Sequence, residues 1–305
     1  MGSSHKTEIT CQPYEFEDPE LDATIRSTAT LNIDILLYGE TGTGKDTLAE
    51  KFHSLSGRCG SYIAINCAAI PESLAESQLF GVTHGAFTGA MQSRAGFIEA
   101  ANMGTLYLDE IDSMPLALQA KLLRVLETRG VERLGSTKFI PVDMRVIASA
   151  QASLSEMVEQ GRFRRDLYYR LNVVSLFLPS LRDRREQIVP LFLNLIKREA
   201  QYFKASIPVP CASLLQHIIC HDWPGNVREL RSVAKRFVLG LPPFLSCAHN
   251  GANDKNSLKL RLQQIEKSII KDSLRRNFNN MDAVALELGL AKRTLYNRTK
   301  QLDII

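Results

Sequence analysis

A glycine-rich segment that ends in lysine could hold the phosphates of a nucleotide. The chain contains GETGTGKD at residues 39–46, after an apolar run over 33–38 and before the helix-compatible sequence TLAEKFH. Glycines let backbone N–H groups surround phosphate oxygens at a helix N-terminus, and the lysine can reach the β- and γ-phosphates. A tight turn with a chance lysine is the alternative, which the strand before and the helix after argue against. The spacing predicts a nucleotide-binding P-loop made of Gly39, Glu40, Thr41, Gly42, Thr43, Gly44, Lys45, Asp46 and Thr47.

Two adjacent carboxylates could complete a hydrolytic site. Asp109 and Glu110 end the sequence GTLYLDE, at the C-terminal end of a predicted strand, where α/β proteins bind ligands. We assign Asp109 to Mg²⁺ and Glu110 to activation of the attacking water; capping of the next helix is the alternative. Asp46 stands where P-loops have Ser or Thr, so Asp46 acting through water, or Thr47, would replace the usual hydroxyl ligand of Mg²⁺.

The elements that must position these residues form an α/β pattern. Apolar runs over 33–38, 62–66, 104–108, 144–149 and 173–178 alternate with helix-compatible stretches, which is typical of a mostly parallel sheet. From Arg182 to about Leu239 the periodicity is helical, and the stretch after it favours neither regular element. The predicted organisation is a polar leader over 1–14, a body over 15–240 (α/β to about 180, helical over 181–240), a linker over 241–257 and a helical segment over 258–305.

The composition indicates a folded protein of about two domains. The chain has 305 residues, of which 45% are hydrophobic, enough for buried cores. No apolar run approaches the roughly 18 residues of a membrane span. The start MGSSHKTEIT lacks an apolar signal region, so we expect a cytoplasmic protein without a membrane partner. Six cysteines without a C-x-x-C pair suit reduced thiols, and we expect no structural metal.

Basic residues concentrate near the C-terminus. Residues 255–305 contain eleven Lys or Arg against five Asp or Glu, whereas residues 1–254 contain 26 against 28. The sequence MDAVALELGLAKRTLYNRTKQL would place Ala283, Leu286 and Leu290 inward, with a turn at Gly289. A plain helical hairpin shares this spacing and is the alternative, but a polar, basic second helix suits the DNA major groove. The predicted DNA-binding residues are Lys292, Arg293, Thr294, Asn297 and Arg298.

A small-residue segment with one aromatic side chain lies between the two nucleotide motifs. A flexible loop could hold out the ring of Phe87 for a partner, although an ordinary buried phenylalanine fits the same residues. The segment is GAFTGA, which consists of Gly85, Ala86, Phe87, Thr88, Gly89 and Ala90. It resembles the motif of the bacterial enhancer-binding proteins, the AAA+ ATPases that activate sigma-54 RNA polymerase.

This resemblance covers nearly the whole chain from about Glu17. GETGTGKD and GTLYLDEI are similar to the Walker A and Walker B motifs of the family, and the C-terminal segment resembles its Fis-type domain. The family implies a P-loop AAA+ parallel sheet with a helical lid subdomain, followed by an all-α Fis-like helix-turn-helix domain. It also implies ATP and Mg²⁺ as cofactors, a hexamer, and contact between GAFTGA and sigma-54.

The resemblance assigns roles to further residues. Arg133 in VERLGS would support the GAFTGA loop from a second loop, and Asn66 in INCAAI would restrain Glu110 until nucleotide is sensed. In GRFRRDLYYRLNV, Arg164 and Arg170 would be arginine fingers that reach the γ-phosphate of a neighbouring subunit.

Two more residues would sense the nucleotide. Arg228 in WPGNVREL matches the sensor of the lid. Gln151 in IASAQ would take the sensor I position, where the family usually has Asn.

The combination of GKD, IASAQ and FRRDLYYR with a short chain resembles the HrpS/HrpR-type regulators of type III secretion genes. The leader is too short for a receiver or ligand-sensing domain, so we expect control through expression level or a separate protein. The resemblance implies a related co-activator in a mixed hexamer and a protein antagonist.

The expected function is that of a sigma-54-dependent activator, which binds upstream promoter DNA and uses ATP hydrolysis to remodel the closed polymerase complex. An AAA+ unfoldase is one alternative, and the basic helix-turn-helix argues against it. A nucleotide-switched DNA-binding regulator without remodelling activity is another, and Glu110 with the arginine pair argues against it.

Overall fold

The computed structural model describes residues 19–87, 92–244 and 280–302, together with residues 263, 266–267, 269–271, 273–274 and 276–277. The predicted leader, most of the predicted linker, and Thr88, Gly89 and Ala90 lie outside the described residues. The chain divides into two compact units. The first runs to Arg184 and includes Gly225–Glu229, and the second comprises Arg185–Pro224 and the chain from Leu230 onward.

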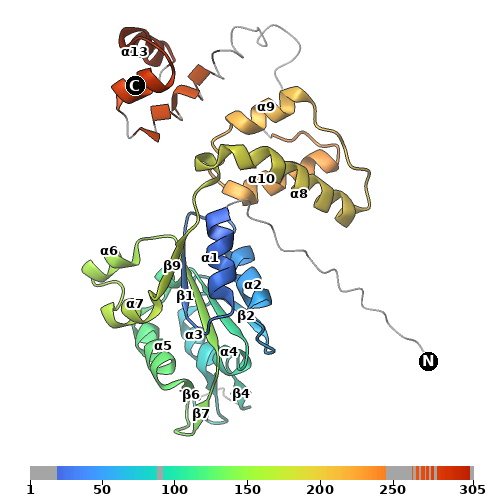
Figure 1. Cartoon of the computed structure of the whole chain (residues 1–305). Coiled ribbons are helices and arrows are strands. Elements are labelled where there is room, and N and C mark those ends of the chain that lie inside the picture. The colour runs from blue at the N-terminus through green and yellow to red at the C-terminus, as the bar shows by residue number, and fades with distance from the viewer. Residues whose placement is uncertain are drawn as a thin grey trace, which may run out of the picture. The chain divides into compact units, whose positions relative to one another are not determined.

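A five-stranded parallel sheet forms the centre of the first unit (Figure 1). Its strand order is β2-β5-β8-β1-β9, and every neighbouring pair is parallel. These strands are β1 (Ile35–Tyr38), β2 (Tyr62–Asn66), β5 (Thr105–Asp109), β8 (Arg145–Ala150) and β9 (Val174–Phe177). The predicted α/β fold class with a parallel sheet is confirmed.

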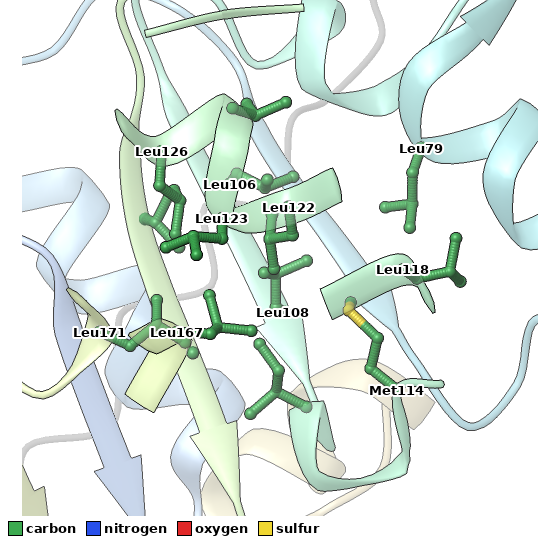
Figure 2. Packing of buried hydrophobic residues seen from close by; sticks show 14 of the residues in the cluster. Leu79, Leu106, Leu108, Met114, Leu118, Leu122, Leu123, Leu126, Leu167 and Leu171 are labelled. Atoms are coloured by element: carbon green, nitrogen blue, oxygen red, sulfur yellow. The ribbon is translucent and has the colours of Figure 1, made fainter. Parts of the chain in front are cut away.

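Helices cover both faces of this sheet because its strands alternate buried side chains between two faces. The helices of the first unit are α1 (Pro19–Ala29), α2 (Lys45–Leu55), α3 (Glu72–Phe80), α4 (Phe97–Ala100), α5 (Leu116–Thr128), α6 (Leu154–Glu159) and α7 (Arg165–Leu171), with 3-10 turns at Ile111–Ser113 and Leu181–Asp183. On one face, Leu37 and Tyr107 pack with α1 and α2. On the other, Leu106 and Leu108 pack with α5 and α7, as Figure 2 shows.

Two short antiparallel pairs accompany the main sheet. They are β3 (Gly81–Val82) with β4 (Arg94–Ala95), and β6 (Gly130–Glu132) with β7 (Phe139–Pro141). The GAFTGA segment lies between β3 and β4. Runs of two or three residues are too short to show a period, so the sequence did not indicate these pairs.

The second unit contains the remaining helices. The lid part has a 3-10 turn at Arg185–Gln187, α8 (Ile188–Phe203), α9 (Ala212–Cys220) and most of α10, which runs from Asn226 to Val238. Trp223 is fully buried, and its Nε1 donates to the carbonyl oxygen of Ile218 at 2.9 Å. None of the described helices is long and apolar enough to cross a membrane.

The C-terminal helices form the predicted helix-turn-helix with a different inner face. Helix α12 (Met281–Glu287) buries Val284 and Ala285, and α13 (Lys292–Gln301) buries Leu295. The prediction that Leu286 points inward is wrong, because its side chain is 87% exposed. Leu290 is also 36% exposed. Helix α12 has only seven residues, so once Val284 and Ala285 face the core, Leu286 falls on the opposite side.

Candidate functional site

The C-terminal ends of four neighbouring strands place the predicted nucleotide residues along one edge of the sheet. β1 ends at Tyr38, in register with Ala150 of β8, and β2 ends at Asn66, in register with Asp109 of β5. The P-loop directly follows β1, and Gln151 directly follows β8. Ligands of open α/β sheets bind at this edge.

The P-loop has a backbone that glycine adopts without strain. Gly42 and Gly44 have φ angles of 78° and 105°, and Gly44 is the N-cap of α2. A Cβ atom on Gly42 would also lie 2.5 Å from the carbonyl oxygen of Gly225. The first N–H groups of α2 have no partner inside the helix, so they can donate to phosphate oxygens.

Lys45 is held inside this loop. Its side chain is 6% exposed, and Nζ donates to the carbonyl oxygens of Gly39 at 2.7 Å and Glu40 at 3.1 Å. Burial lowers the pKa of Lys45, and the carboxylates of Asp109 and Asp46 oppose that shift. A nucleotide phosphate offers this ammonium a stronger, charged acceptor at the same place.

Asn226 holds the P-loop in place, and no sequence motif pointed to this residue. Its side chain is fully buried, and Nδ2 donates to the carbonyl oxygen of Thr41 at 3.0 Å and to Oε2 of Glu40 at 3.2 Å. Its Oδ1 accepts from the N–H of Leu181 at 2.7 Å. The backbone of Asn226 is left-handed, with φ of 51°, so the amide is aimed at the loop at a conformational cost.

Two arginines support the same loop. Arg182 forms an ion pair with Glu40, and this contact lowers the pKa of that carboxyl group. Arg184 donates from Nη2 to the carbonyl oxygen of Thr43 at 3.1 Å. The P-loop backbone is therefore held by Leu181–Arg184 and by the start of α10.

Arg228, the predicted lid sensor, lies in the first turn of α10. Its backbone N–H donates to the carbonyl oxygen of Gly42 at 3.3 Å, next to the N–H of Val227, which donates to the same oxygen at 2.9 Å. The residue is thus anchored beside the P-loop through its main chain.

Asp109 lies at the centre of a set of hydrogen-bond donors. Its Oδ1 accepts from Oγ of Ser149 at 2.5 Å, and its Oδ2 accepts from Nδ2 of Asn66 at 3.2 Å. Asn66, the predicted restraint on Glu110, lies opposite Asp109 in the strand register, one residue before Glu110.

Glu110 is held by Gln151. Nε2 of Gln151 donates to Oε1 of Glu110 at 2.6 Å, while Oε1 of Gln151 accepts from the hydroxyl of Thr41 at 2.6 Å. Glu110 has a φ angle of 54°, which turns its side chain away from the direction of β5. The amide of Gln151 therefore bridges the P-loop and the predicted catalytic carboxylate.

Asp46 is linked to Asp109 through one buried hydroxyl. The hydroxyl of Tyr107 lies 2.9 Å from Oδ1 of Asp46 and 3.1 Å from Oδ1 of Asp109. These carboxylate oxygens form a hard donor set that suits Mg²⁺. Thr47, the other predicted substitute ligand, is half-buried in the first turn of α2.

The two predicted arginine fingers have different surroundings. Arg164 is the N-cap residue of α7 and pairs with Asp166 at 2.7 Å on the surface. Its backbone N–H donates to Oε1 of the buried Gln119 at 2.8 Å. The guanidinium of Arg164 is thus presented outward from a fixed backbone.

Arg170 is tied to a buried carboxylate. Its Nη1 lies 2.8 Å from Oδ2 of Asp34, which is 2% exposed, and its Nη2 donates to the carbonyl oxygen of Leu126 at 3.1 Å. Arg129 also approaches Asp34, at 3.6 Å. Because Asp34 precedes β1, this ion pair lies at the sheet edge opposite the P-loop of the same subunit.

The base of the GAFTGA segment is paired with a second loop. The N–H of Leu134 donates to the carbonyl oxygen of Gly81, and the N–H of Thr83 donates to that of Leu134, both at 3.0 Å. Arg133 forms a bidentate ion pair with Glu99 at 2.9 and 2.6 Å, which anchors this second loop on α4.

The described part of the GAFTGA segment is open to solvent. Phe87 is 52% exposed, and Thr88, Gly89 and Ala90 lie outside the described residues. An aromatic side chain in this setting is accessible to a partner.

The five predicted DNA-binding residues are all exposed on α13. Lys292 pairs with Asp282 at 2.6 Å, and Arg298 lies 3.3 Å from Glu266. Tyr296, which was not among the predicted residues, is 59% exposed between them. Helix α13 contains four basic residues and no acidic one, which suits a phosphate-lined groove.

The chain matches three protein families in succession. Residues 17–177 match the Sigma-54 interaction domain, residues 182–242 the AAA+ ATPase lid domain, and residues 261–302 the bacterial regulatory protein family of Fis type.

Similar proteins include two pathogenicity-locus regulators. HrpS of Pseudomonas syringae pv. syringae is 56% identical over 297 residues, which cover 95% of this chain and 98% of that protein. WtsA of Pantoea stewartii subsp. stewartii is 55% identical, with 96% of this chain and 90% of that protein covered. Among solved structures, NtrX from Brucella abortus in complex with ADP is 30% identical, with a TM-score of 0.73 and coverage of 93% of this chain and 68% of that one.

The surroundings of the two arginines predict different effects of their removal. Arg170→Ala leaves the buried Asp34 with only the more distant Arg129 as an ion-pair partner among the described residues. We therefore expect the free energy of unfolding to fall by about 2–4 kcal/mol. Arg164→Ala removes a surface ion pair and should change that free energy by less than about 0.5 kcal/mol. Urea denaturation followed by circular dichroism measures both. Equal, small losses for the two variants would contradict a structural role of Arg170.

Proposed function

Because the chain belongs to the family of sigma-54-dependent transcriptional activators, we propose that it hydrolyses Mg²⁺-ATP as a hexamer to remodel the closed polymerase complex. Sigma-54 polymerase and promoter DNA are the partners of this family. The observation that carries the proposal is the placement of Lys45, Asp109 and Glu110 on one sheet edge. The same unit carries the GAFTGA segment on its β3–β4 pair.

The site supplies the groups that ATP hydrolysis requires. The P-loop N–H groups and Lys45 would bind the phosphates, and Asp109 with Asp46 would hold Mg²⁺, which neutralises charge on the phosphates when bound. Glu110 would orient and deprotonate the attacking water.

Gln151 provides a way to couple nucleotide binding to the release of Glu110. Its amide is hydrogen-bonded to Thr41 on one side and to Glu110 on the other. A γ-phosphate bound at the P-loop would compete for the donors of Thr41 and Gln151, because charged acceptors form stronger hydrogen bonds. Loss of the bridge would free the Glu110 carboxylate for water.

The arginines support assembly into a ring. Arg170 lies at the sheet edge opposite the nucleotide site of its own subunit, and Arg164 projects from the surface. The position of Arg170 and the outward guanidinium of Arg164 support both residues as candidates for contact with a neighbouring subunit. In a ring, Arg170 would exchange its partner Asp34 for that contact.

We further propose a role in type III secretion gene expression. HrpS and HrpR of the same pathovar are each 56% identical to this chain, which supports mixed hexamers with a related co-activator. A separate protein antagonist would then regulate the activator. Neither an AAA+ unfoldase nor a nucleotide-switched DNA-binding regulator without remodelling activity accounts for a hydrolytic carboxylate, a GAFTGA loop and a basic recognition helix in one chain.

The roles of Lys45 and Glu110 can be separated. Lys45→Ala should weaken ATP binding by at least about tenfold, because a charge-assisted contact to phosphate is lost. Glu110→Gln should keep ATP affinity within about twofold and lower the steady-state hydrolysis rate by 100-fold or more. Calorimetric ATP binding and phosphate release measure the two effects. Equal loss of binding in both variants would contradict these roles.

Promoter binding should depend on α13. Arg293→Ala should weaken binding to the upstream site about fivefold or more, and it should lower the slope of log affinity against log salt concentration by about one. Arg276→Ala is the matched control, because Arg276 pairs with Glu287 outside α13. Fluorescence anisotropy at several salt concentrations measures both. An equal effect of the two substitutions would place the DNA contact elsewhere.

A further inference from the structure

Tyr107 is a buried side chain whose hydroxyl points at charged groups. Strand periodicity sets Thr105, Tyr107 and Asp109 on one face of β5, toward α2, and Asp46 lies in the first turn of α2. Tyr107 is 2% exposed. Its hydroxyl lies 2.9 Å from Oδ1 of Asp46 and 3.1 Å from Oδ1 of Asp109.

We propose that the hydroxyl of Tyr107 positions Asp46 beside Asp109, so that Asp46 serves as the second carboxylate of the Mg²⁺ site in place of the hydroxyl ligand that this P-loop lacks. This inference rests on the proposed ATPase function. Tyr107 is a positioning residue here, because it acts on the metal through the two carboxylates.

The hydroxyls of Tyr107 and Ser149 each have one hydrogen to donate, and the hydrogen bonds indicate which carboxylate each of them serves. A phenol and a serine hydroxyl each carry one donor hydrogen. Ser149 is fully buried, and its Oγ donates to Oδ1 of Asp109 at 2.5 Å. The same Oγ accepts from the N–H of Glu110 at 3.2 Å. Ser149 therefore satisfies Asp109, which leaves the hydrogen of Tyr107 for Asp46.

The arrangement favours a cation between the carboxylates. Both carboxylates lie within about 3 Å of the same hydroxyl oxygen, so they repel each other, and a divalent ion relieves this repulsion more effectively than neutral donors can. Among the described residues, no hydrogen bond reaches Oδ2 of Asp46, and this oxygen can face the ion or one of its water ligands.

The alternative is that Tyr107 only fills the core. Its ring stacks on Tyr62 with centroids 6.1 Å apart and an interplanar angle of 16°. A core role predicts that loss of the hydroxyl changes stability or all nucleotide binding, whereas the positioning role predicts a change in the dependence on Mg²⁺ alone.

The experiment measures ATP affinity of the full chain by calorimetry, first in EDTA and then across a Mg²⁺ titration. For Tyr107→Phe we expect an ATP affinity in EDTA within about twofold of wild type, and an apparent Mg²⁺ affinity lowered about tenfold, as for other residues that orient metal ligands. Tyr62→Phe is the control, since the Tyr62 hydroxyl has no hydrogen bond in the described part of the chain. It should leave both values unchanged.

A second pair of variants tests the link to Asp46. In an Asp46→Ser background the P-loop regains its own hydroxyl, so adding Tyr107→Phe should cost no further Mg²⁺ affinity. If Tyr107→Phe fails to fold, Asp46→Asn replaces it, with the same tenfold loss expected.

Three results would overturn the inference. They are a wild-type Mg²⁺ dependence in Tyr107→Phe or Asp46→Asn, an equal loss of ATP affinity with and without Mg²⁺, and the same loss from Tyr107→Phe in both backgrounds. Failure of the proposed function would look different, because wild-type protein would then bind no ATP or would not hydrolyse it.

Discussion

The parallel register of β2, β5, β8 and β1 is the constraint on which the whole site depends. Parallel strands bring their C-terminal ends to one edge, and this places the P-loop next to Gln151 and Asn66 opposite Asp109. The two-residue period of a strand then decides which side chains face α2 and which enter the core under α5. A slip of one residue in β5 would turn Asp109 into the apolar core and Leu108 toward the P-loop.

A second layer of contacts holds the phosphate loop against this edge. Asn226 and Arg184 donate to carbonyl oxygens of the P-loop, and Arg182 pairs with Glu40. These donors belong to segments that immediately precede and follow the lid helices α8 and α9. The P-loop backbone is therefore held by residues that lie just before α8 and just after α9 in the chain.

The sequence was sufficient for the five strands of the parallel sheet and for the two nucleotide motifs, because their residues carry local signals. The position of Tyr107 also follows from strand periodicity once Asp109 is placed, whereas that of Ser149 depends on the register between β5 and β8. Contacts between side chains that are far apart in the sequence leave no local pattern from which they could be predicted. Whether Glu110 meets Asn66 or Gln151 depends on the backbone turn after β5, and the pairing of Arg170 with Asp34 joins residues far apart in the chain.

The proposed function couples ATP hydrolysis at this site to opening of promoter DNA by sigma-54 polymerase. This coupling is tested most directly by permanganate detection of melted promoter DNA, with the purified chain, sigma-54 polymerase and a template that carries the upstream site. We expect melting with Mg²⁺-ATP and none with ADP or a non-hydrolysable ATP analogue. Equal melting with the analogue, or steady ATP hydrolysis without any melting, would contradict it.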